Sequence, residues 1–71
     1  MKASKSQGMM FILNMLITNG RIDKKTVIKT LGISNLTFRR YMQELRAFYF
    51  NFMDHEEVVY DKASDSYFLE K

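Results

Sequence analysis

Two side chains that can read the edges of base pairs stand three residues apart in the middle of the chain. Arg40 can bridge the two acceptors of guanine, and the amide of Gln43 can pair with adenine. Slightly earlier, Asn35 offers a second amide and Leu36 an apolar group that fits the methyl of thymine. Helical spacing places Leu36, Arg40 and Gln43 on one open face, with Asn35 in the first turn, and we expect base contacts from all four residues. The alternative for Arg40 and Gln43 is ordinary solvated helix surface, and for Asn35 it is support of the helix cap. For Leu36, contact with thymine and simple exposure are evenly balanced.

Side chains suited to phosphate surround these four positions. Phosphate oxygens accept hydrogen bonds from Lys, Arg and hydroxyl groups, and such contacts fix the register of a protein on a duplex. We expect them from six residues: Lys24, Lys25, Lys29, Ser34, Thr37 and Arg39. The alternatives are a solvated lysine face, support of the helix cap by Thr37, and pairing of Arg39 with an acid at little energetic gain.

Charge is divided unevenly along the 71 residues, whose net charge is +3. Residues 1–46 carry nine Lys or Arg against two acids, whereas residues 47–71 carry two lysines against six acids. A split of this kind predicts one side that faces a polyanion, and an acidic second half that is free for a protein partner. The alternative is a chance imbalance on a solvated surface.

Hydrophobic periodicity predicts three helices, over residues 7–18, 24–31 and 34–48. The first is apolar almost all round, as in a helix that is buried on several sides. Asp23 and Ser34 are expected N-caps of the second and third. The third helix places four apolar residues on one face: Phe38, Met42, Leu45 and Tyr49.

Two glycines and a polar segment predict the connections. Gly20 and Gly32 each follow a helix and can adopt the left-handed conformation that ends it. Arg21 and Ile22 then form a short extended link. Residues 57–60 and 66–69 are rich in β-branched and aromatic types and predict two strands, joined by a polar hairpin loop over residues 61–65. The expected fold class is mainly α with a small β-hairpin.

The segment around the second turn resembles the helix-turn-helix of DeoR-like winged-helix regulators. The residues that carry the resemblance, in order, are Leu31, Gly32, Ile33, Ser34, Thr37, Arg39, Arg40, Met42 and Leu45. Residues 67–69, Tyr-Phe-Leu, are similar to the end of the family's wing, and the resemblance covers roughly residues 7–70. It implies a winged helix-turn-helix domain, with three helices followed by a two-stranded wing, over residues 7–71 after a disordered basic tail at 1–6.

The same resemblance implies the function and places the helix of residues 34–48 in the major groove. We expect sequence-specific binding of double-stranded DNA by a small cytoplasmic transcriptional regulator, a repressor or accessory factor of a bacterium or mobile element. The chain departs from the family at Ser66, where glycine is usual, and at its net negative hairpin tip. The tip leaves open whether the wing touches DNA or a protein.

Apolar side chains exceed what one small core can bury. We expect a homodimer interface from six of them, with packing under the wing as the alternative: Met9, Met10, Ile17, Phe48, Phe50 and Phe52. A domain of this size also lacks a disulfide staple, since the chain has no Cys, which leaves a partner subunit as the expected substitute.

Several other functions find no support in the residues. There is no paired-carboxylate, nucleophile–histidine or Gly-rich phosphate motif, so no enzyme and no cofactor is expected. The single histidine, His55, predicts no metal site, and no apolar run is long enough to cross a membrane. The competing interpretation is a protein–protein interaction module on a winged-helix scaffold that regulates a larger complex.

Overall fold

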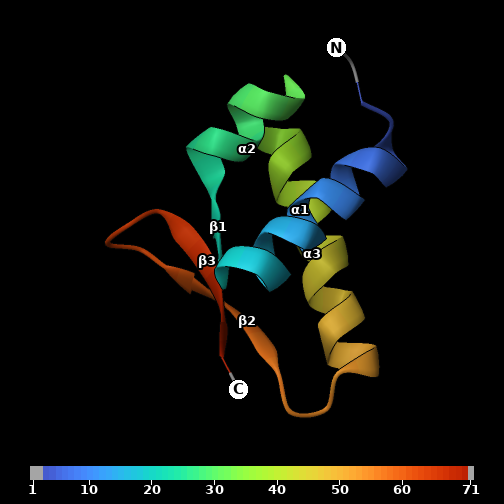
Figure 1. Ribbon diagram of the computed structural model, residues 1–71, viewed down its shortest axis with the longest axis vertical. Coiled ribbons are helices and arrows are strands. Elements are labelled where there is room, and N and C mark those ends of the chain that lie inside the picture. Colours follow the sequence, from blue (N-terminus) through green and yellow to red (C-terminus); the bar gives the residue numbers. More distant parts are fainter. Residues whose placement is uncertain (1–2, 71) are drawn as a thin grey trace.

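The computed structural model describes residues 3–70 of the chain. It is mainly helical, with three helices and a small three-stranded antiparallel sheet (Figure 1). The elements follow in the order α1 (Lys5–Asn19), β1 (Arg21–Asp23), α2 (Lys24–Leu31), α3 (Asn35–Phe52), β2 (Glu57–Asp61) and β3 (Ser66–Glu70).

Helix α1 begins at Lys5, two residues before the predicted start. The Ser4 hydroxyl accepts a hydrogen bond from the amide of Gln7 at 3.2 Å, and the Gln7 side chain accepts one from the Ser4 amide at 3.3 Å. This reciprocal pair satisfies two amides that the first turn leaves free, so the helix extends to Lys5. The tail predicted over residues 1–6 is therefore too long: Lys5 and Ser6 are helical, and Met1 and Lys2 lie outside the described residues.

The turn between α2 and α3 follows the prediction. Gly32 has a φ of 64°, and its amide donates to the carbonyl of Ile28 at 2.9 Å, which closes α2. The hydroxyl of Ser34 then accepts from the amide of Thr37 at 3.1 Å and caps α3.

Helix α3 runs to Phe52, one turn beyond the predicted end at residue 48. Tyr49 continues its buried face, and the Phe48 and Phe52 rings, four residues apart, lie 5.4 Å from each other. Both contacts stabilise one more helical turn after residue 48.

The link at Arg21 and Ile22 is a strand, so the sheet has three strands and the predicted two-stranded wing is incomplete. Strand β1 pairs antiparallel with β3, with Ile22 opposite Tyr67, and the strand order is β1-β3-β2. Three residues are too few to show the alternation of a strand. The partner strand β3 also lies more than 40 residues away in the sequence, so no local sequence pattern predicts that β1 pairs with it.

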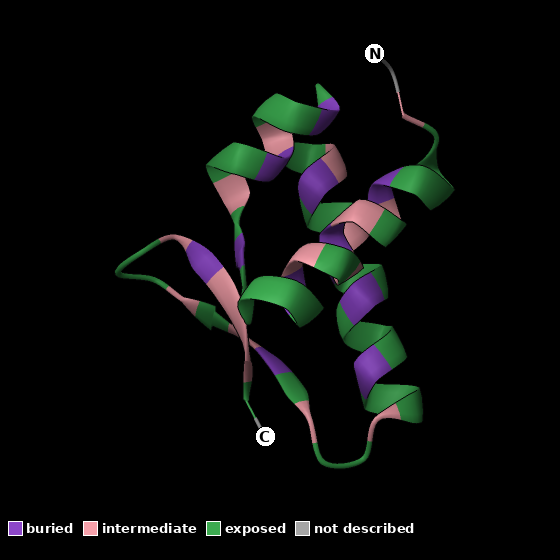
Figure 2. Cartoon of the chain, in the orientation of Figure 1, coloured by how far each residue is buried: buried purple, intermediate pink, exposed green. Residues whose placement is uncertain are grey.

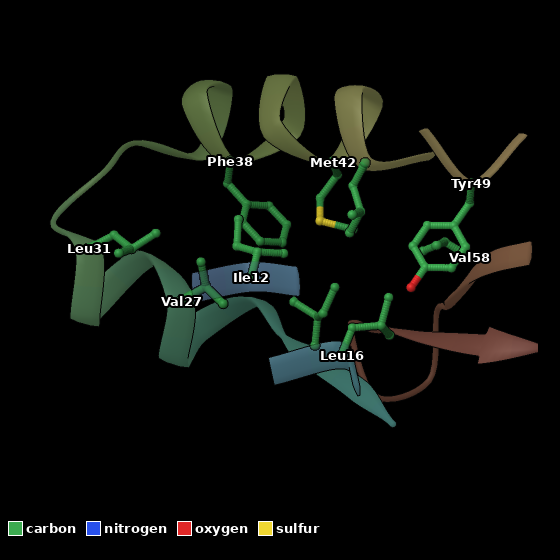
Figure 3. Packing of buried hydrophobic residues seen from close by; sticks show 10 residues of the cluster. Ile12, Leu16, Val27, Leu31, Phe38, Met42, Tyr49 and Val58 are labelled. Carbon is green, nitrogen blue, oxygen red and sulfur yellow. The ribbon is translucent and has the colours of Figure 1, made fainter. Parts of the chain in front are cut away.

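The core lies where the three helices meet the sheet. Phe38, Met42 and Tyr49 of α3 point toward Ile12 and Leu16 of α1 (Figure 3). Val27 and Leu31 of α2, Ile22 of β1, Leu45 of α3 and Val58 of β2 complete the buried set. Among residues 3–70, no helix is both long and apolar enough to cross a membrane.

Candidate nucleic-acid interface

Close packing on one side of α3 defines which side stays open. At Gly8, α1 approaches α3 so nearly that a Cβ built there lies 2.9 Å from Cε2 of Tyr41. The face of α3 that carries Phe38 and Met42 is buried in the core. The residues opposite that face are exposed, and buried and exposed residues alternate along α3 in Figure 2. Gly8 had no signal in the sequence, because a close helix approach depends on the partner helix.

The four predicted base contacts are all exposed on α3. At 3.6 residues per turn, Leu36, Arg40 and Gln43 fall within about 60° of the helix circumference and form one strip. Asn35 lies in the first turn, about 100° from Leu36, and therefore beside the strip. The helix brings together three of the four residues, and their chemistry suits guanine, adenine and the thymine methyl.

The predicted phosphate contacts lie on α2 and at the start of α3. Lys25 and Lys29 are exposed on α2. Lys24 is half-buried and shares with Arg39 a polar recess of about 300 Å³, which Phe38, Tyr60, Asp65 and Tyr67 also line. The recess lies between the two helices and the hairpin, so it brings side chains from three parts of the chain together.

Ser34 and Thr37 serve the helix cap. The Ser34 hydroxyl donates to Oγ1 of Thr37 at 3.1 Å while it accepts from the Thr37 amide. The hydroxyl proton of Ser34 is therefore engaged within the cap, whereas the hydroxyl proton of Thr37 is free to reach an acceptor outside it. Of the two, Thr37 is better placed to donate to phosphate.

Cations of the predicted interface have no acidic partners within the described residues. Over residues 3–70 only two ion pairs occur, Lys5 with Glu44 at 3.9 Å and Arg21 with Asp61 at 3.8 Å. Neither includes any of the five interface cations, which are Lys24, Lys25, Lys29, Arg39 and Arg40. None of the five lies within ion-pair distance of a carboxylate, although Asp65 lines the recess that Lys24 and Arg39 share, so most of this positive charge is available to attract a polyanion.

Hydrogen bonds within the sheet hold the first acid of the hairpin. Nη2 of Arg21 donates to the hydroxyls of Ser64 and Ser66 at 2.7 and 2.5 Å. The carboxylate of Asp61 accepts from the Ser64 hydroxyl at 2.7 Å and from the Ala63 amide at 3.2 Å. The hydrogen bond from Ser64, helped by the Ala63 amide and the charge of Arg21, lowers the pKa of Asp61.

The second acid of the hairpin is also engaged. The hydroxyl of Tyr60 donates to Asp65 at 2.7 Å, and this hydrogen bond is the main reason that the pKa of Tyr60 is raised. From the sequence these acids predict only a negative tip, and nothing in the residue pattern indicates their partners, of which Arg21 is the most distant in the chain. At the loop itself Lys62 and Ala63 are exposed, and the loop projects away from the helices (Figure 1).

The six apolar residues expected at a dimer interface do not share one surface. Met10, Ile17, Phe48, Phe50 and Phe52 are exposed, whereas Met9 is half-buried against the core. Met9, Met10 and Phe48 line one groove between α1 and α3. Phe50 lines a different cavity, of about 610 Å³, beside Arg46 and the segment that joins α3 to β2. Helix α3 therefore separates Phe50 from the other aromatic residues.

No protein-family model, curated protein or solved structure matches this chain.

Proposed function

We propose that the chain is a winged helix-turn-helix domain, similar to the N-terminal domain of DeoR-like regulators, that binds double-stranded DNA sequence-specifically. The observation that carries this proposal is the open face of α3, where Leu36, Arg40 and Gln43 form one strip beside cations that lack acidic partners among residues 3–70. The order of helices and strands is compatible with a winged-helix fold.

In this proposal α3 lies in the major groove with its N-terminal half against the bases. Arg40 bridges guanine and Gln43 pairs with adenine, while Leu36 contacts a thymine methyl and Asn35 reaches an adjacent base from the side. A helix of this diameter fits the groove without deforming it.

Phosphates on either side are held by α2 and the start of α3. Lys24 and Arg39 act from the shared recess, Lys25 and Lys29 from the exposed face of α2, and Thr37 through its free hydroxyl proton. Asp23 stands at the N-cap of α2 as predicted, but its carboxylate accepts from the hydroxyl of Thr26 and makes no capping hydrogen bond to a backbone amide.

The wing fits beside DNA in spite of its composition. Asp61 and Asp65 are engaged by Ser64, Arg21 and Tyr60, so the exposed tip is formed by Lys62 and Ala63. Arg21 offsets the charge of Asp61, whereas Asp65 keeps its negative charge, so the hairpin can approach phosphate only through Lys62 at the exposed loop.

The biological role that follows is regulation of transcription by occupying a site, as a repressor or accessory factor in the cytoplasm of a bacterium or of a cell carrying a mobile element. No catalytic step and no cofactor belongs to this proposal.

The first test is a titration of the chain into a labelled random-sequence duplex, followed by fluorescence anisotropy at two salt concentrations. Contacts to about five phosphates give a logarithmic slope of about −4 to −5 against salt, because each neutralised phosphate releases counterions. Binding that is weak at low salt and insensitive to salt would contradict the proposal.

Two neighbouring arginines provide a matched pair for the second step, after selection of a preferred site. Arg40→Ala is expected to lose about 1–3 kcal/mol of binding free energy and to relax preference at one base position. Arg39→Ala removes the same charge but is expected to weaken all sequences alike and to reduce the salt slope by about 1. If Arg40→Ala behaves like Arg39→Ala, the assignment of Arg40 to a base is wrong.

The second candidate function is a protein-interaction module that regulates a larger complex. The observation that favours it is the exposure of Phe48, Phe50 and Phe52 near the acidic second half of the chain. Absence of DNA binding at low salt, together with one stoichiometric protein recovered from native extract, would favour this function over DNA binding.

A further inference from the structure

One apolar surface lies away from the proposed DNA face. The groove between α1 and α3 has a volume of about 290 Å³, and Met9, Met10, Leu13, Leu45 and Phe48 form its apolar lining. Phe52 extends this surface along α3, since its ring lies against Phe48. Ile17 extends this surface along α1, because it follows Met10 by seven residues and therefore lies on the same side of the helix. We call this surface the α1/α3 patch.

The patch is large enough to matter for association. Met10 is 66% exposed, Ile17 67%, Phe48 42% and Phe52 71%. With roughly 200 Å² for each fully exposed large side chain, these four residues present about 500 Å² of apolar surface. Two such patches facing each other bury about 1,000 Å², the lower limit for a specific protein–protein interface.

The charged residues at the rim of the patch can pair with the same residues of a second copy. Lys5 and Glu44 flank the groove 3.9 Å apart, and both side chains are well exposed. A twofold axis brings the same surface of two copies together, so that each residue of a contacting pair is used twice. Because Lys5 and Glu44 lie side by side in each copy, Lys5 of each copy can face Glu44 of the other.

We propose that the α1/α3 patch binds a second copy of this chain and forms a twofold homodimer. Phe48 and Met10 of each copy fill the groove of the other, with Lys5 and Glu44 paired across the rim. Phe50 takes no part, because it lies on another side of α3 and lines a different cavity.

The proposed dimer leaves the DNA face open. Around α3, Phe48 lies about 80° from Arg40 and about 140° from Gln43, and Glu44 at the rim lies about 40° from Arg40, so the interface borders the strip at Glu44 and does not cover it. The dimer and the DNA contact thus use different sides of the same helix, and either can be present without the other.

Sedimentation equilibrium from about 10 to 500 µM tests the dimer, since an interface of this size associates weakly. The mass of the unmodified chain is expected to rise toward twice its 8.5 kDa as the concentration increases. Met10→Glu and Phe48→Glu are expected to remain at the mass of one chain. The matched control is Phe50→Glu, which introduces the same charge at a residue that is 86% exposed and is expected to associate like the unmodified chain.

Charge variants at the rim test the twofold pairing and spare the core, because Lys5 and Glu44 are exposed. Lys5→Glu leaves two acids at the rim and Glu44→Lys leaves two bases, so each variant alone is expected to associate several-fold more weakly. An equimolar mixture of the two variants is expected to recover association, because opposite rims then face each other.

Three results would overturn the proposal: one-chain mass of the unmodified protein at the highest concentration, loss of association in Phe50→Glu but not in Met10→Glu, or no recovery in the mixture. Each is independent of the anisotropy titration, because a monomer can still bind a single site on a random duplex.

Discussion

Arg21 and Asp61 organise the hairpin through the hydroxyl of Ser64, which both of them contact. Arg21 donates to Ser64 and Ser66, and Asp61 accepts from Ser64, so side chains of β1, β2, β3 and the hairpin loop depend on one another. Ser66 is the buried polar residue of this set, and its hydroxyl is satisfied by Arg21 and by Ser64 at 2.6 Å. A glycine at position 66 would leave Arg21 with one hydroxyl fewer.

Stability in acid is expected to depend on Asp61. The hydrogen bond from Ser64, with the Ala63 amide and Arg21, lowers the pKa of Asp61 below its ordinary value of 3.8. A lowered pKa means that the ionised carboxylate stabilises the folded state above pH 3.8, and that this stabilisation is lost as the pH falls through the folded-state pKa. Asp61→Asn lacks an ionisable group, so the Tm difference between the unmodified chain and this variant should shrink below about pH 4.

The measurement is thermal unfolding followed by circular dichroism at a series of pH values. Asp54→Asn is the control, since Asp54 is an exposed acid outside the hairpin. A Tm difference for Asp61→Asn that stays constant down to the lowest pH would show that the carboxylate charge does not stabilise the hairpin.

Among the elements, the turn between α2 and α3 sets the direction of the proposed recognition helix. Gly32 stands in the left-handed conformation, and Ser34 caps α3 two residues later. No atom lies within 4 Å of a Cβ built on Gly32, so the turn requires glycine for its backbone conformation and not for space.

Gly32→Ala is therefore expected to lower the free energy of unfolding by about 1 kcal/mol through backbone strain alone. Gly32→Asn should lower it less, because Asn tolerates the left-handed conformation. Urea unfolding measures both variants. Equal stability of Gly32→Ala and the unmodified chain, or a larger loss in Gly32→Asn, would refute this account of the turn.

For the whole molecule, β1 joins the helical part to the sheet. It follows α1, precedes α2 and pairs with β3, and its central residue, Ile22, is completely buried. A domain of about 70 residues has a free energy of unfolding of only about 4–10 kcal/mol, so a single contact of this kind accounts for a large part of it.

Ile22→Ala is expected to remove about 2–5 kcal/mol, because it opens a cavity between the helices and the sheet. Ile17→Ala is the matched control: the same substitution at an exposed residue is expected to change stability by less than about 0.5 kcal/mol. Denaturation at a few micromolar, below the expected range of dimerisation, compares the two. Similar losses in both would mean that β1 is not a structural link.

Features that depend on near neighbours in the chain were predictable from the residue types. The bounds of α2, the buried face of α3 with Phe38 and Met42, and both hairpin strands follow from local periodicity and capping. The exposure of Arg40 and Gln43 follows as well, because positions opposite a buried face must point to solvent.

Other features depend on contacts between residues that are distant in the sequence, and no local sequence pattern predicts such contacts. The pairing of β1 with β3, the bonds from Arg21 to Ser64 and Ser66, and the approach of α1 to Tyr41 at Gly8 are of this kind. The separation of Phe50 from Phe48 is different, because residues two apart lie on opposite sides of any helix and only the extension of α3 past residue 48 was not predicted. Periodicity describes one element, whereas packing decides which of its sides is covered and by what.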